Sequence, residues 1–206
     1  WYNRNFINGI NNKILLSVPV KFKTSQETKH KDILIDNTKN WQSEHWKSIY
    51  ISYSKYPYFY KYEKDLKKFY EKKWSKLVDL NTSLLFKLLE WLKIKKKIVR
   101  ASDYNLKQKK SDLIIEMCLE LKQKNYLFGE LGKNYCDFNK FKKFKIEPYF
   151  QKYIHPKYKV LNKRKFYENL SVLDLLFYYG DKSVDIILKN NLSKEEILSE
   201  NHEKNQ

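Results

Sequence analysis

The first forty residues contain short apolar runs separated by polar, turn-like residues. The run at residues 13–22 is apolar and partly β-branched and follows the polar segment 8–12, which is typical of a strand entered from a turn. Pro19 lies inside this run and marks an edge or a bulge, because proline cannot donate a hydrogen bond to a neighbouring strand. A second strand is predicted at residues 32–36. This part of the chain is therefore expected to form hairpin-like β-strands.

From residue 40 onward the apolar positions recur with the spacing of a helix. A first helix is predicted between Asn40, which would cap it, and Pro57, which would end it. Its apolar face is rich in aromatic residues and consists of Trp41, Trp46, Ile49, Tyr50 and Tyr53. A second helix is predicted at residues 58–74, and a third begins at Asp79 or Asn81 and carries a stripe of leucines. The sequence therefore predicts an aromatic-rich helical segment after the strands.

After residue 96 the pattern alternates between strands and helices. A strand at 97–101, a helix at 111–122 and a strand at 125–128 are predicted in that order, which is typical of a parallel βαβ unit. The alternation continues with elements at 138–144, 146–150 and 170–179. The whole pattern predicts an α/β fold with a mainly parallel sheet flanked by helices. We expect a single domain over residues 1–190, followed by a helix and a frayed tail over 191–206.

The net charge of the chain is weaker evidence for a phosphate-bearing partner than its magnitude suggests. The 206 residues are 42% hydrophobic, enough for one buried core, and carry a formal net charge of +18. Only Arg4, Arg100 and Arg164 are arginines, so 39 of the 42 basic residues are lysine, whereas recognition of phosphates and bases favours arginine. Lysine, asparagine, isoleucine, tyrosine and phenylalanine are abundant together, as adenine- and thymine-rich codons would give. We therefore interpret much of the lysine as solvated surface and expect no nucleic-acid partner.

Cysteine usage and hydropathy indicate the compartment. Cys118 and Cys136 form no C-x-x-C pair and have no histidine cluster beside them, so we expect neither a disulfide nor a metal site. Two isolated thiols fit the reducing cytoplasm. No apolar run approaches the roughly 20 residues that a membrane span needs. We expect a cytoplasmic protein without a membrane span, and because the sequence starts at Trp1 rather than at methionine, we interpret it as a fragment.

Two loops are expected at one edge of the predicted sheet, where ligands of parallel sheets bind. Ser102 and Asp103 follow the strand predicted at 97–101, and Gly129 follows the next strand. Main-chain N–H groups near Gly129 could approach a phosphate, with Lys133 as a point charge and Tyr135 beside it. The spacing does not match the phosphate-binding G-x-x-x-x-G-K pattern. A tight β-to-α turn that needs glycine for its geometry is the alternative.

Two histidines and one aspartate are the other candidates for chemistry. Pro156 keeps the main chain of His155 extended on a loop, where an imidazole could act as an acid or base; a structural hydrogen bond is the alternative. Tyr158 ends the same turn. Asp174 is the polar residue of an apolar helix and needs a partner, because a bare buried carboxylate is costly; it could orient a loop or take part in catalysis. His45 is expected to belong to a packed or capped helix surface.

The N-terminal residues combine amides with an arginine. Asn3 and Asn5 flank Arg4, a group that could clamp a carboxylate or phosphate; a terminal surface patch is the alternative. We predict that segments 102–103, 129–135 and 155–158 line one concave pocket with Arg4 at its edge.

Several motifs occur in a fixed order along the chain. They are Tyr-Asn-Arg-Asn at 2–5, Ser-Val-Pro-Val at 17–20, Asn-Trp at 40–41, His-Trp at 45–46, the aromatic run 53–59, Leu-Asn at 80–81, Ser-Asp at 102–103, Tyr-Leu-Phe-Gly at 126–129 with Tyr135, His-Pro-Lys-Tyr at 155–158 and the segment 170–177. Together they resemble the WbqC-like family of bacterial proteins. The resemblance runs from residue 1 to about residue 180, and the ordered set is far more specific than any single motif.

The resemblance implies a pathway more firmly than a reaction. Family genes lie among those for O-antigen and other surface polysaccharides, and the addition of an aminoacyl group such as glycine to an amino sugar has been suggested for some members. Members usually carry a further strand–helix–strand segment before the Asn-Arg-Asn stretch, and Phe128 replaces a residue that is commonly small. Where a family motif and the residue chemistry coincide, we nominate His155, Asp103 and Tyr158 as catalytic residues, and Asn3, Arg4, Asn5, Ser102, Gly129, Tyr135 and Asp174, together with Lys133, as substrate-binding residues.

The leading hypothesis is a transferase that joins an acyl or aminoacyl group to the nitrogen of a nucleotide-linked or lipid-linked amino sugar. His155 would remove the amine proton. Arg4 and Lys133 would hold phosphate, and Tyr135 and Tyr158 would line the sugar pocket. An activated acyl or aminoacyl donor would be the second substrate; the sequence defines no cofactor. A non-catalytic scaffold or carrier-binding protein of the same pathway is the first alternative, and a nucleic-acid-binding protein, for which no recognisable motif is present, is the second.

Overall fold

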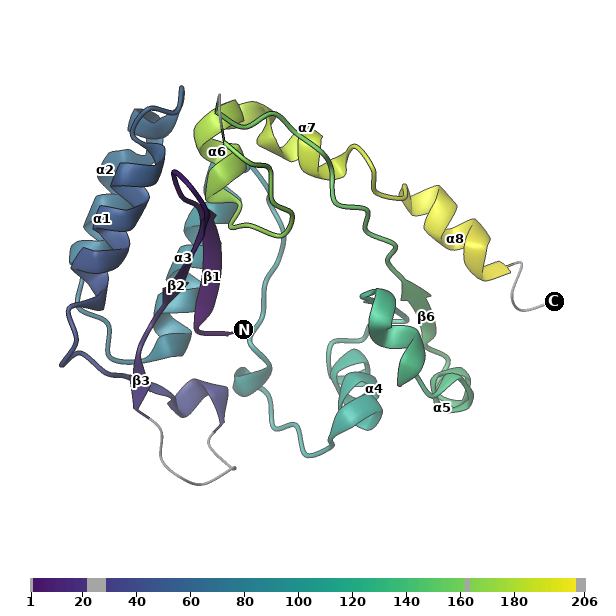
Figure 1. Cartoon of the computed structure of the whole chain (residues 1–206). Coiled ribbons are helices and arrows are strands. Elements are labelled where there is room, and N and C mark those ends of the chain that lie inside the picture. The colour runs from purple at the N-terminus through teal and green to yellow at the C-terminus, as the bar shows by residue number, and fades with distance from the viewer. Residues whose placement is uncertain (1, 22–28, 162–163, 203–206) are drawn as a thin grey trace. The chain divides into compact units, whose positions relative to one another are not determined.

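A computed structural model shows a mixed α/β protein (Figure 1). It describes residues 2–21, 29–161 and 164–202. Helices predominate, and the strands form short two-stranded sheets, one of which is parallel. The predicted α/β class is therefore confirmed.

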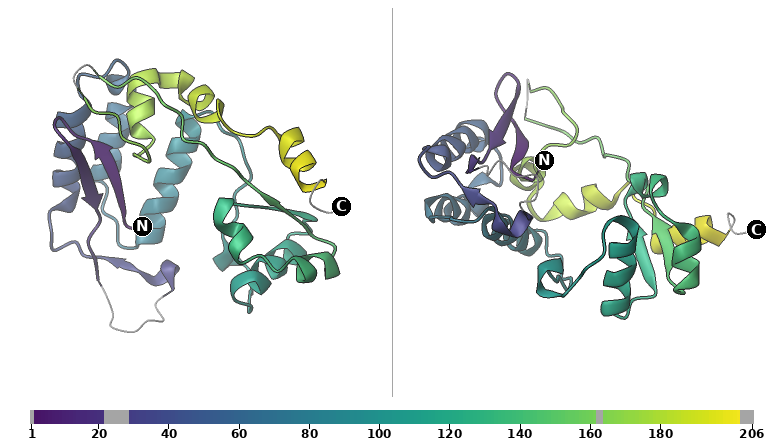
Figure 2. Two further views of the ribbon diagram at one scale, coloured as in Figure 1. Left: turned by 45° about the vertical axis from the view of Figure 1, so that its right-hand side comes forward. Right: turned by 90° about the horizontal axis from the view of Figure 1, so that it is seen from below.

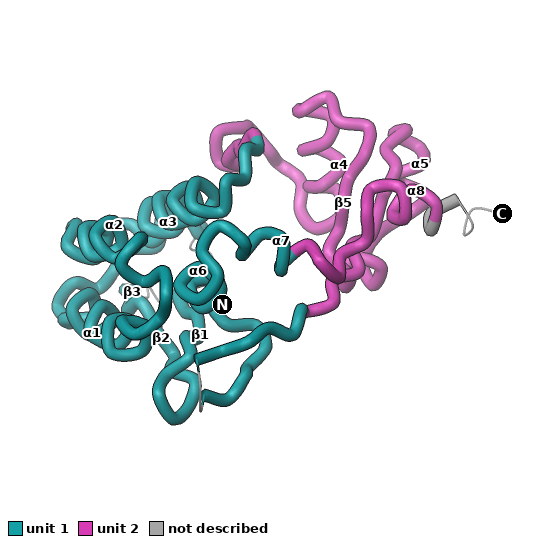
Figure 3. Tube along the Cα trace, turned by 90° about the horizontal axis from the view of Figure 1, so that it is seen from above, with its two compact units in different colours: residues 1–96, 156–187 teal, residues 97–155, 188–206 magenta. Residues whose placement is uncertain are grey.

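The chain divides into two compact units, coloured separately in Figure 3. Unit 1 comprises residues 1–96 and 156–187, and unit 2 comprises residues 97–155 and 188–206. The predicted boundary at residue 190 is not tested by this division and stays a prediction.

Unit 1 begins with a β-hairpin, as the sequence predicts. β1 (Arg4–Asn8) pairs antiparallel with β2 (Lys13–Ser17), with Arg4 opposite Ser17. Gly9 makes the tight turn that follows, because a Cβ there would overlap the carbonyl oxygen of Asn12 and lie 2.7 Å from the side chain of Ile14. Figure 2 shows the two strands of the hairpin side by side.

The rest of the predicted strand run is interrupted at the proline. β3 (Val20–Lys21) is a separate short strand that pairs antiparallel with β4 (Leu34–Ile35). Pro19 stands between β2 and β3, where its missing N–H ends the first ladder. Residue 22 of the predicted run lies outside the described residues.

Five α-helices follow within the described residues of unit 1, and the first three confirm the aromatic-rich helical segment. They are α1 (Trp41–Tyr53), α2 (Phe59–Glu71), α3 (Leu77–Trp91), α6 (Leu173–Tyr179) and α7 (Ser183–Leu188). The second predicted helix, 58–74, ends three residues early at Glu71. The cause is local: Trp74 is buried, and its indole N–H donates a hydrogen bond to the Phe69 carbonyl oxygen at 3.0 Å.

An aromatic core holds α6 against α1 and α2. The ring of Phe177 lies 5.0 Å from that of Tyr53 and 5.2 Å from that of Phe59, between centroids. All three side chains are fully buried, together with Ile7 of β1. A second cluster joins β3 and β4 to the starts of α1 and α3 and consists of Val18, Ile33, Ile35, Trp41, Trp74, Leu77 and Leu80. The two clusters support the hairpin from both ends.

Unit 2 contains the parallel sheet. Its elements are α4 (Lys110–Glu120), β5 (Asn125–Phe128), α5 (Phe138–Lys143), β6 (Glu147–Phe150) and α8 (Lys194–His202). β5 and β6 are parallel neighbours joined through α5. The rings of Phe128 and Phe150, which are opposite each other in the register, stack at 5.3 Å and 14°.

The strand predicted at residues 97–101 is wrong. Residues 97–100 form neither helix nor strand, and Ala101–Asp103 is a single 3₁₀ turn. Ile98 and Val99 have the β-branched shape of strand residues, but they are 37% and 38% exposed, so no core face holds them in a sheet. The predicted link between this segment and β5 is therefore wrong as well, and β6 is the parallel partner of β5.

No helix among the described residues is both long enough and apolar enough to cross a membrane.

The helix predicted after residue 193 is present as α8, where the Ser193 N–H donates to the Glu196 carboxylate and the Glu196 N–H donates to the Ser193 hydroxyl. This reciprocal pair satisfies two main-chain donors at the start of the helix.

Candidate functional site

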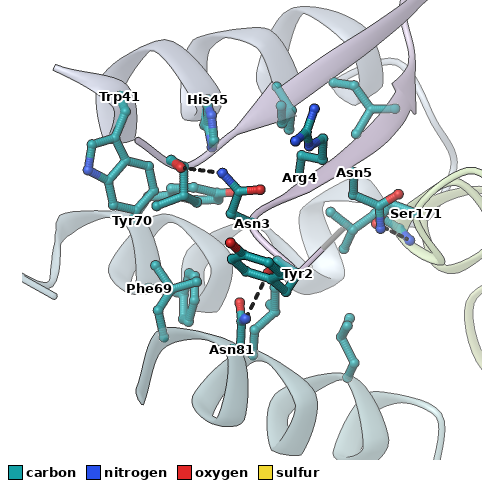
Figure 4. Close-up of a pocket in the computed structure, with 17 residues that line it drawn as sticks. Tyr2, Asn3, Arg4, Asn5, Trp41, His45, Phe69, Tyr70, Asn81 and Ser171 are labelled. Carbon is teal, nitrogen blue, oxygen red and sulfur yellow. Dashed lines mark hydrogen bonds between the residues drawn. The ribbon is translucent and has the colours of Figure 1, made fainter. Parts of the chain in front are cut away.

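A cavity of about 250 Å³ opens in unit 1 where the hairpin faces α1, the end of α2 and α3 (Figure 4). The lining residues come from segments far apart in the sequence and are Tyr2, Asn3, Arg4, Asn5, Ile7, Leu16, Val18, Trp41, His45, Phe69, Tyr70, Leu80, Asn81, Leu84, Leu88, Ser171 and Leu173. The structure therefore brings the predicted substrate-binding residues Asn3, Arg4 and Asn5 to one cavity.

Main-chain hydrogen bonds hold the N-terminal stretch against this cavity. The Asn3 carbonyl oxygen accepts from the Val18 N–H at 2.8 Å, and the Asn3 side-chain Nδ2 donates back to the Val18 carbonyl at 3.1 Å. From α3, Asn81 Nδ2 donates to the Tyr2 carbonyl oxygen at 2.9 Å. These bonds extend the hairpin ladder past Arg4. They hold the main chain in place where the Arg4 side chain is attached.

His45 lies on α1 one turn after Trp41 and is 7% exposed. Its Nε2 is 3.2 Å from the Ser17 carbonyl oxygen at the end of β2. A carbonyl oxygen can only accept, so Nε2 carries the proton of the neutral ring and Nδ1 is left as an acceptor. Burial lowers the pKa of His45 below its ordinary value of 6.5, and the Ser17 carbonyl and the Glu44 carboxylate act in the opposite direction. The imidazole is thus a buried, neutral group with a defined tautomer.

Aromatic rings and leucines form the remaining wall of the cavity. Trp41 and Tyr70 present their rings edge-on or at steep angles to the imidazole of His45, with centroids 5.3 Å and 6.0 Å from it. Burial also raises the pKa of the Tyr70 hydroxyl well above its usual range. Apolar ring surface beside a few polar atoms is the usual make-up of a small-molecule site, and rings of this kind pack against the apolar faces of sugars.

Charge in the cavity comes from one residue. Among the described lining residues, Arg4 is the sole side chain with a formal charge, and no aspartate or glutamate lines the cavity. The site therefore favours an anionic group near Arg4, since the guanidinium binds phosphate or carboxylate through two parallel N–H bonds.

Asp174 is fully buried in α6 and does not line this cavity, although its neighbour Leu173 does. Burial raises the pKa of Asp174, whereas the hydroxyls of Tyr158 and Tyr53 and the charge of Arg164 lower it. Burial has the largest effect, so the carboxyl group holds its proton more tightly than in water.

The surroundings of Asp174 connect it to the end of β1. The Tyr53 hydroxyl accepts a hydrogen bond from the Asn8 N–H at 2.8 Å, and Arg164 Nη1 donates to the Asn8 carbonyl at 2.6 Å. The Arg164 guanidinium also lies 5.3 Å from the ring centre of Tyr56. Asp174 itself is not among the residues that line the cavity, and its role in orienting a loop or in catalysis stays a prediction.

The other nominated residues lie in unit 2, apart from Tyr158. Ser102 and Asp103 are exposed in the 3₁₀ turn after residue 100, and His155 has its ring centroid 6.1 Å from that of Tyr153. Tyr158 belongs to unit 1, where its ring packs edge-on against Phe166 and Tyr179. Whether segments 102–103, 129–135 and 155–158 converge is not tested here and stays a prediction.

The loop after β5 is a 3₁₀ turn, Glu130–Asn134, that begins after Gly129. A Cβ at Gly129 would meet open space, but one at Gly132 would overlap the side chain of Phe128. Lys133 Nζ lies 5.7 Å from the ring centre of Phe150, and Tyr135 is 57% exposed. The glycine that this turn needs is thus Gly132, because of its packing, rather than Gly129.

The sequence analysis expected His45 on a packed or capped helix surface, and its burial agrees with the packing. That His45 also lines the cavity was not predicted. The spacing of Trp41 and His45, four residues apart, was the available signal, because residues four apart share one face of a helix.

Within the described residues, no group of three or more histidine, cysteine, aspartate or glutamate side chains could hold a metal ion, and Cys118 and Cys136 are free thiols.

Comparisons with known proteins identify a family and a relative for this chain. A model of the WbqC-like protein family matches residues 1–186. Among curated proteins, "Uncharacterized protein Rv1507c" of Mycobacterium tuberculosis is 29% identical to this chain over 189 residues, which cover 91% of this chain and 81% of that protein. No solved structure matches the chain.

Proposed function

The chain belongs to the WbqC-like protein family, and we propose that it is a cytoplasmic transferase of bacterial surface-polysaccharide (O-antigen) biosynthesis. The reaction is the transfer of an acyl or aminoacyl group, such as glycyl, to the nitrogen of a nucleotide-linked or lipid-linked amino sugar. The pathway follows from what the family resemblance implies, and the chemistry of the cavity supports the substrate class.

The observation that carries the proposal is the lining of the unit 1 cavity. Amide side chains, one arginine and one neutral imidazole stand among aromatic rings. The volume of about 250 Å³ lies below the roughly 300–1,000 Å³ of sites for drug-sized ligands. It therefore suits one sugar ring, with the nucleotide or lipid part of the substrate outside.

Arg4 is the group that would hold the anionic end of such a substrate. Every activated sugar of these classes carries phosphate next to its ring, and arginine binds phosphate with two parallel N–H bonds. Asn5 stands beside Arg4 in the lining, with its Oδ1 accepting the Phe6 N–H at 2.8 Å. Its Nδ2 is then the donor available to a sugar hydroxyl or phosphate oxygen.

The reaction itself is nucleophilic acyl transfer. The amine nitrogen forms a bond to the carbonyl carbon of an ester or thioester donor. The bond between that carbon and the donor's leaving group breaks, and the leaving group departs with its electron pair. A base removes the amine proton and passes it to the leaving group, and oxyanion stabilisation lowers the barrier.

The test is the composition of surface polysaccharide in the source cells. We expect deletion of the gene to remove one N-linked acyl or aminoacyl substituent and reintroduction of the intact gene to restore it. Arg4→Gln should restore it poorly, whereas Arg100→Gln, the same change at an exposed arginine of unit 2, should restore it fully. Unchanged polysaccharide after deletion would contradict the transferase function and leave the scaffold or carrier-binding alternatives.

A further inference from the structure

Three polar side chains that line the cavity of unit 1 each donate a hydrogen bond to a main-chain carbonyl. Asn3 Nδ2 donates to the Val18 carbonyl, Asn81 Nδ2 donates to the Tyr2 carbonyl, and His45 Nε2 donates to the Ser17 carbonyl. The first two bonds are drawn as dashed lines in Figure 4. In each case the partner is a main-chain oxygen, which cannot donate.

These bonds fix the orientation of the three side chains. Turning an amide over would place its oxygen against a carbonyl oxygen, and the other tautomer of His45 would place a lone pair there. The acceptor atoms left over are Asn3 Oδ1, Asn81 Oδ1 and His45 Nδ1, and each amide keeps one further N–H. Within residues 2–21, 29–161 and 164–202, none of these three atoms has a hydrogen-bond partner.

The cavity thus presents three acceptor atoms, one each from the N-terminal stretch, α1 and α3, and one cation, Arg4. A carboxylate or phosphate fits the arginine but not the acceptors, because an ionised carboxylate or phosphate oxygen has no proton to donate. A hydroxyl group offers one donor, whereas an amine offers two N–H donors and keeps a lone pair. The charge of Arg4, with no carboxylate in the lining, favours the neutral amine over the ammonium ion.

We infer that His45 Nδ1 binds the primary amine of the acceptor sugar and receives its proton. The inference rests on the proposed function for the identity of the amine. As the nitrogen lone pair forms the bond to the acyl carbon of the ester or thioester donor, one N–H proton moves to Nδ1. The leaving group then departs with the electron pair of the broken acyl bond and takes this proton from the imidazolium.

Two substitutions at His45 test the roles of the two ring nitrogens separately. The amide nitrogen of glutamine lies where Nε2 of histidine lies, so His45→Gln keeps a donor for the Ser17 carbonyl and removes the acceptor at Nδ1. The side-chain amide of asparagine lies where Nδ1 lies, so His45→Asn keeps an acceptor there and removes the donor to Ser17. A purely structural histidine would tolerate glutamine better than asparagine, and the inferred amine acceptor predicts the reverse for amine binding.

The experiment is calorimetric titration with glucosamine, glucose and N-acetylglucosamine at a pH above the pKa of the sugar amine. We expect the wild-type chain to bind glucosamine at least tenfold more tightly than the other two, and His45→Gln to lose this preference while unfolding at an unchanged temperature. His45→Asn should keep part of it. Equal binding of all three sugars, no binding of glucosamine, or a preference that survives in His45→Gln would each overturn the inference.

The proposed function and this inference fail separately. If deletion of the gene removes a sugar substituent but the purified chain shows no preference for the amine, the transferase stands and the amine binds elsewhere. If the chain prefers the amine but polysaccharide is unchanged, the amine site stands and the biosynthetic role is wrong.

Discussion

The imidazole of His45 on α1 donates from Nε2 to the main-chain carbonyl of Ser17 at the end of β2, 3.2 Å away. This bond joins the first helix to the hairpin across a separation of 28 residues. It also decides which nitrogen of the ring carries the proton, because the carbonyl can only accept. One contact therefore ties the packing of the hairpin to the chemistry of the cavity.

The first prediction concerns the pH dependence of stability that follows from this burial. The pKa of His45 is lowered in the folded chain by burial, so the unfolded chain binds a proton more readily. The stabilisation is present above the ordinary pKa of 6.5 and is lost as pH falls below it toward the lowered folded pKa. His45→Gln cannot titrate, and the decrease in its free energy of unfolding between about pH 7 and pH 5 should be smaller.

Urea unfolding of the two chains across this range measures the difference. Glu44 precedes His45 on α1 and raises its pKa, so Glu44→Gln serves as the companion variant. Its loss should move the folded pKa of His45 further down and widen the pH range over which stability falls. Parallel pH profiles for the wild-type chain and His45→Gln would contradict the prediction.

The second prediction concerns Asp174. Its pKa is raised in the folded chain by burial, so keeping it ionised destabilises the fold at neutral pH. Below its ordinary pKa of 3.8 both states are protonated, and the penalty is absent. It appears as pH rises past that value and is complete above the raised folded pKa. Asp174→Asn should therefore stabilise the chain at neutral pH by on the order of 1 kcal/mol, a common size for one substitution.

Asp181 provides the contrasting case. Hydrogen bonds from Lys61 and Lys93 lower its pKa, so Asp181→Asn should destabilise rather than stabilise at neutral pH. Thermal unfolding of both variants at neutral and acidic pH distinguishes the two signs. If Asp174→Asn unfolds at a lower temperature than the wild-type chain at neutral pH, its carboxylate is needed in the ionised form and the argument from burial is wrong.

Much of the fold was predictable because its signals are local. The helical spacing of aromatic residues in α1, the turn before β2 and the glycine after α6 each act within a few residues. Residues 97–101 show the limit of such signals: Ile98 and Val99 have strand propensity, but a strand also needs a partner and a buried face, which neighbouring sequence does not specify.

Only the part of the candidate site that lies within one sequence motif was predictable. Asn3, Arg4 and Asn5 are adjacent in the sequence and line the cavity together. His45 and Asn81 reach the same cavity from other helices, and their orientation depends on the carbonyls of Ser17 and Tyr2. No spacing in the sequence encodes those tertiary hydrogen bonds.

The third prediction decides between two histidines as the base. The sequence nominates His155, and the cavity indicates His45. In an assay of the transfer reaction we expect His45→Gln to lower turnover by roughly 10²–10⁴-fold, the usual scale for a lost general base. His155→Ala should leave the preference for the amine intact, and Lys157→Ala is the control for a change at the same turn. A large loss of turnover in His155→Ala, with His45→Gln fully active, would establish the sequence-based assignment instead.

The last prediction separates the two glycines of the loop after β5. Gly129 has φ −67° and ψ 169°, an extended conformation open to any residue, and a Cβ there meets nothing within 4 Å. A Cβ at Gly132 would overlap Phe128 Cβ and lie 2.7 Å from Phe128 Cγ, close to the main chain and with no room to move.

Gly132→Ala should therefore destabilise the chain by about 1–3 kcal/mol, as overpacking of a core does. Gly129→Ala should be neutral or slightly stabilising, because alanine restricts the unfolded chain. Amide hydrogen exchange in β5 and β6 measures the effect where Phe128 stacks on Phe150, and protection should fall in the first variant alone. If Gly129→Ala loosens these strands as much as Gly132→Ala does, the loop needs glycine for its backbone rather than for its packing against Phe128.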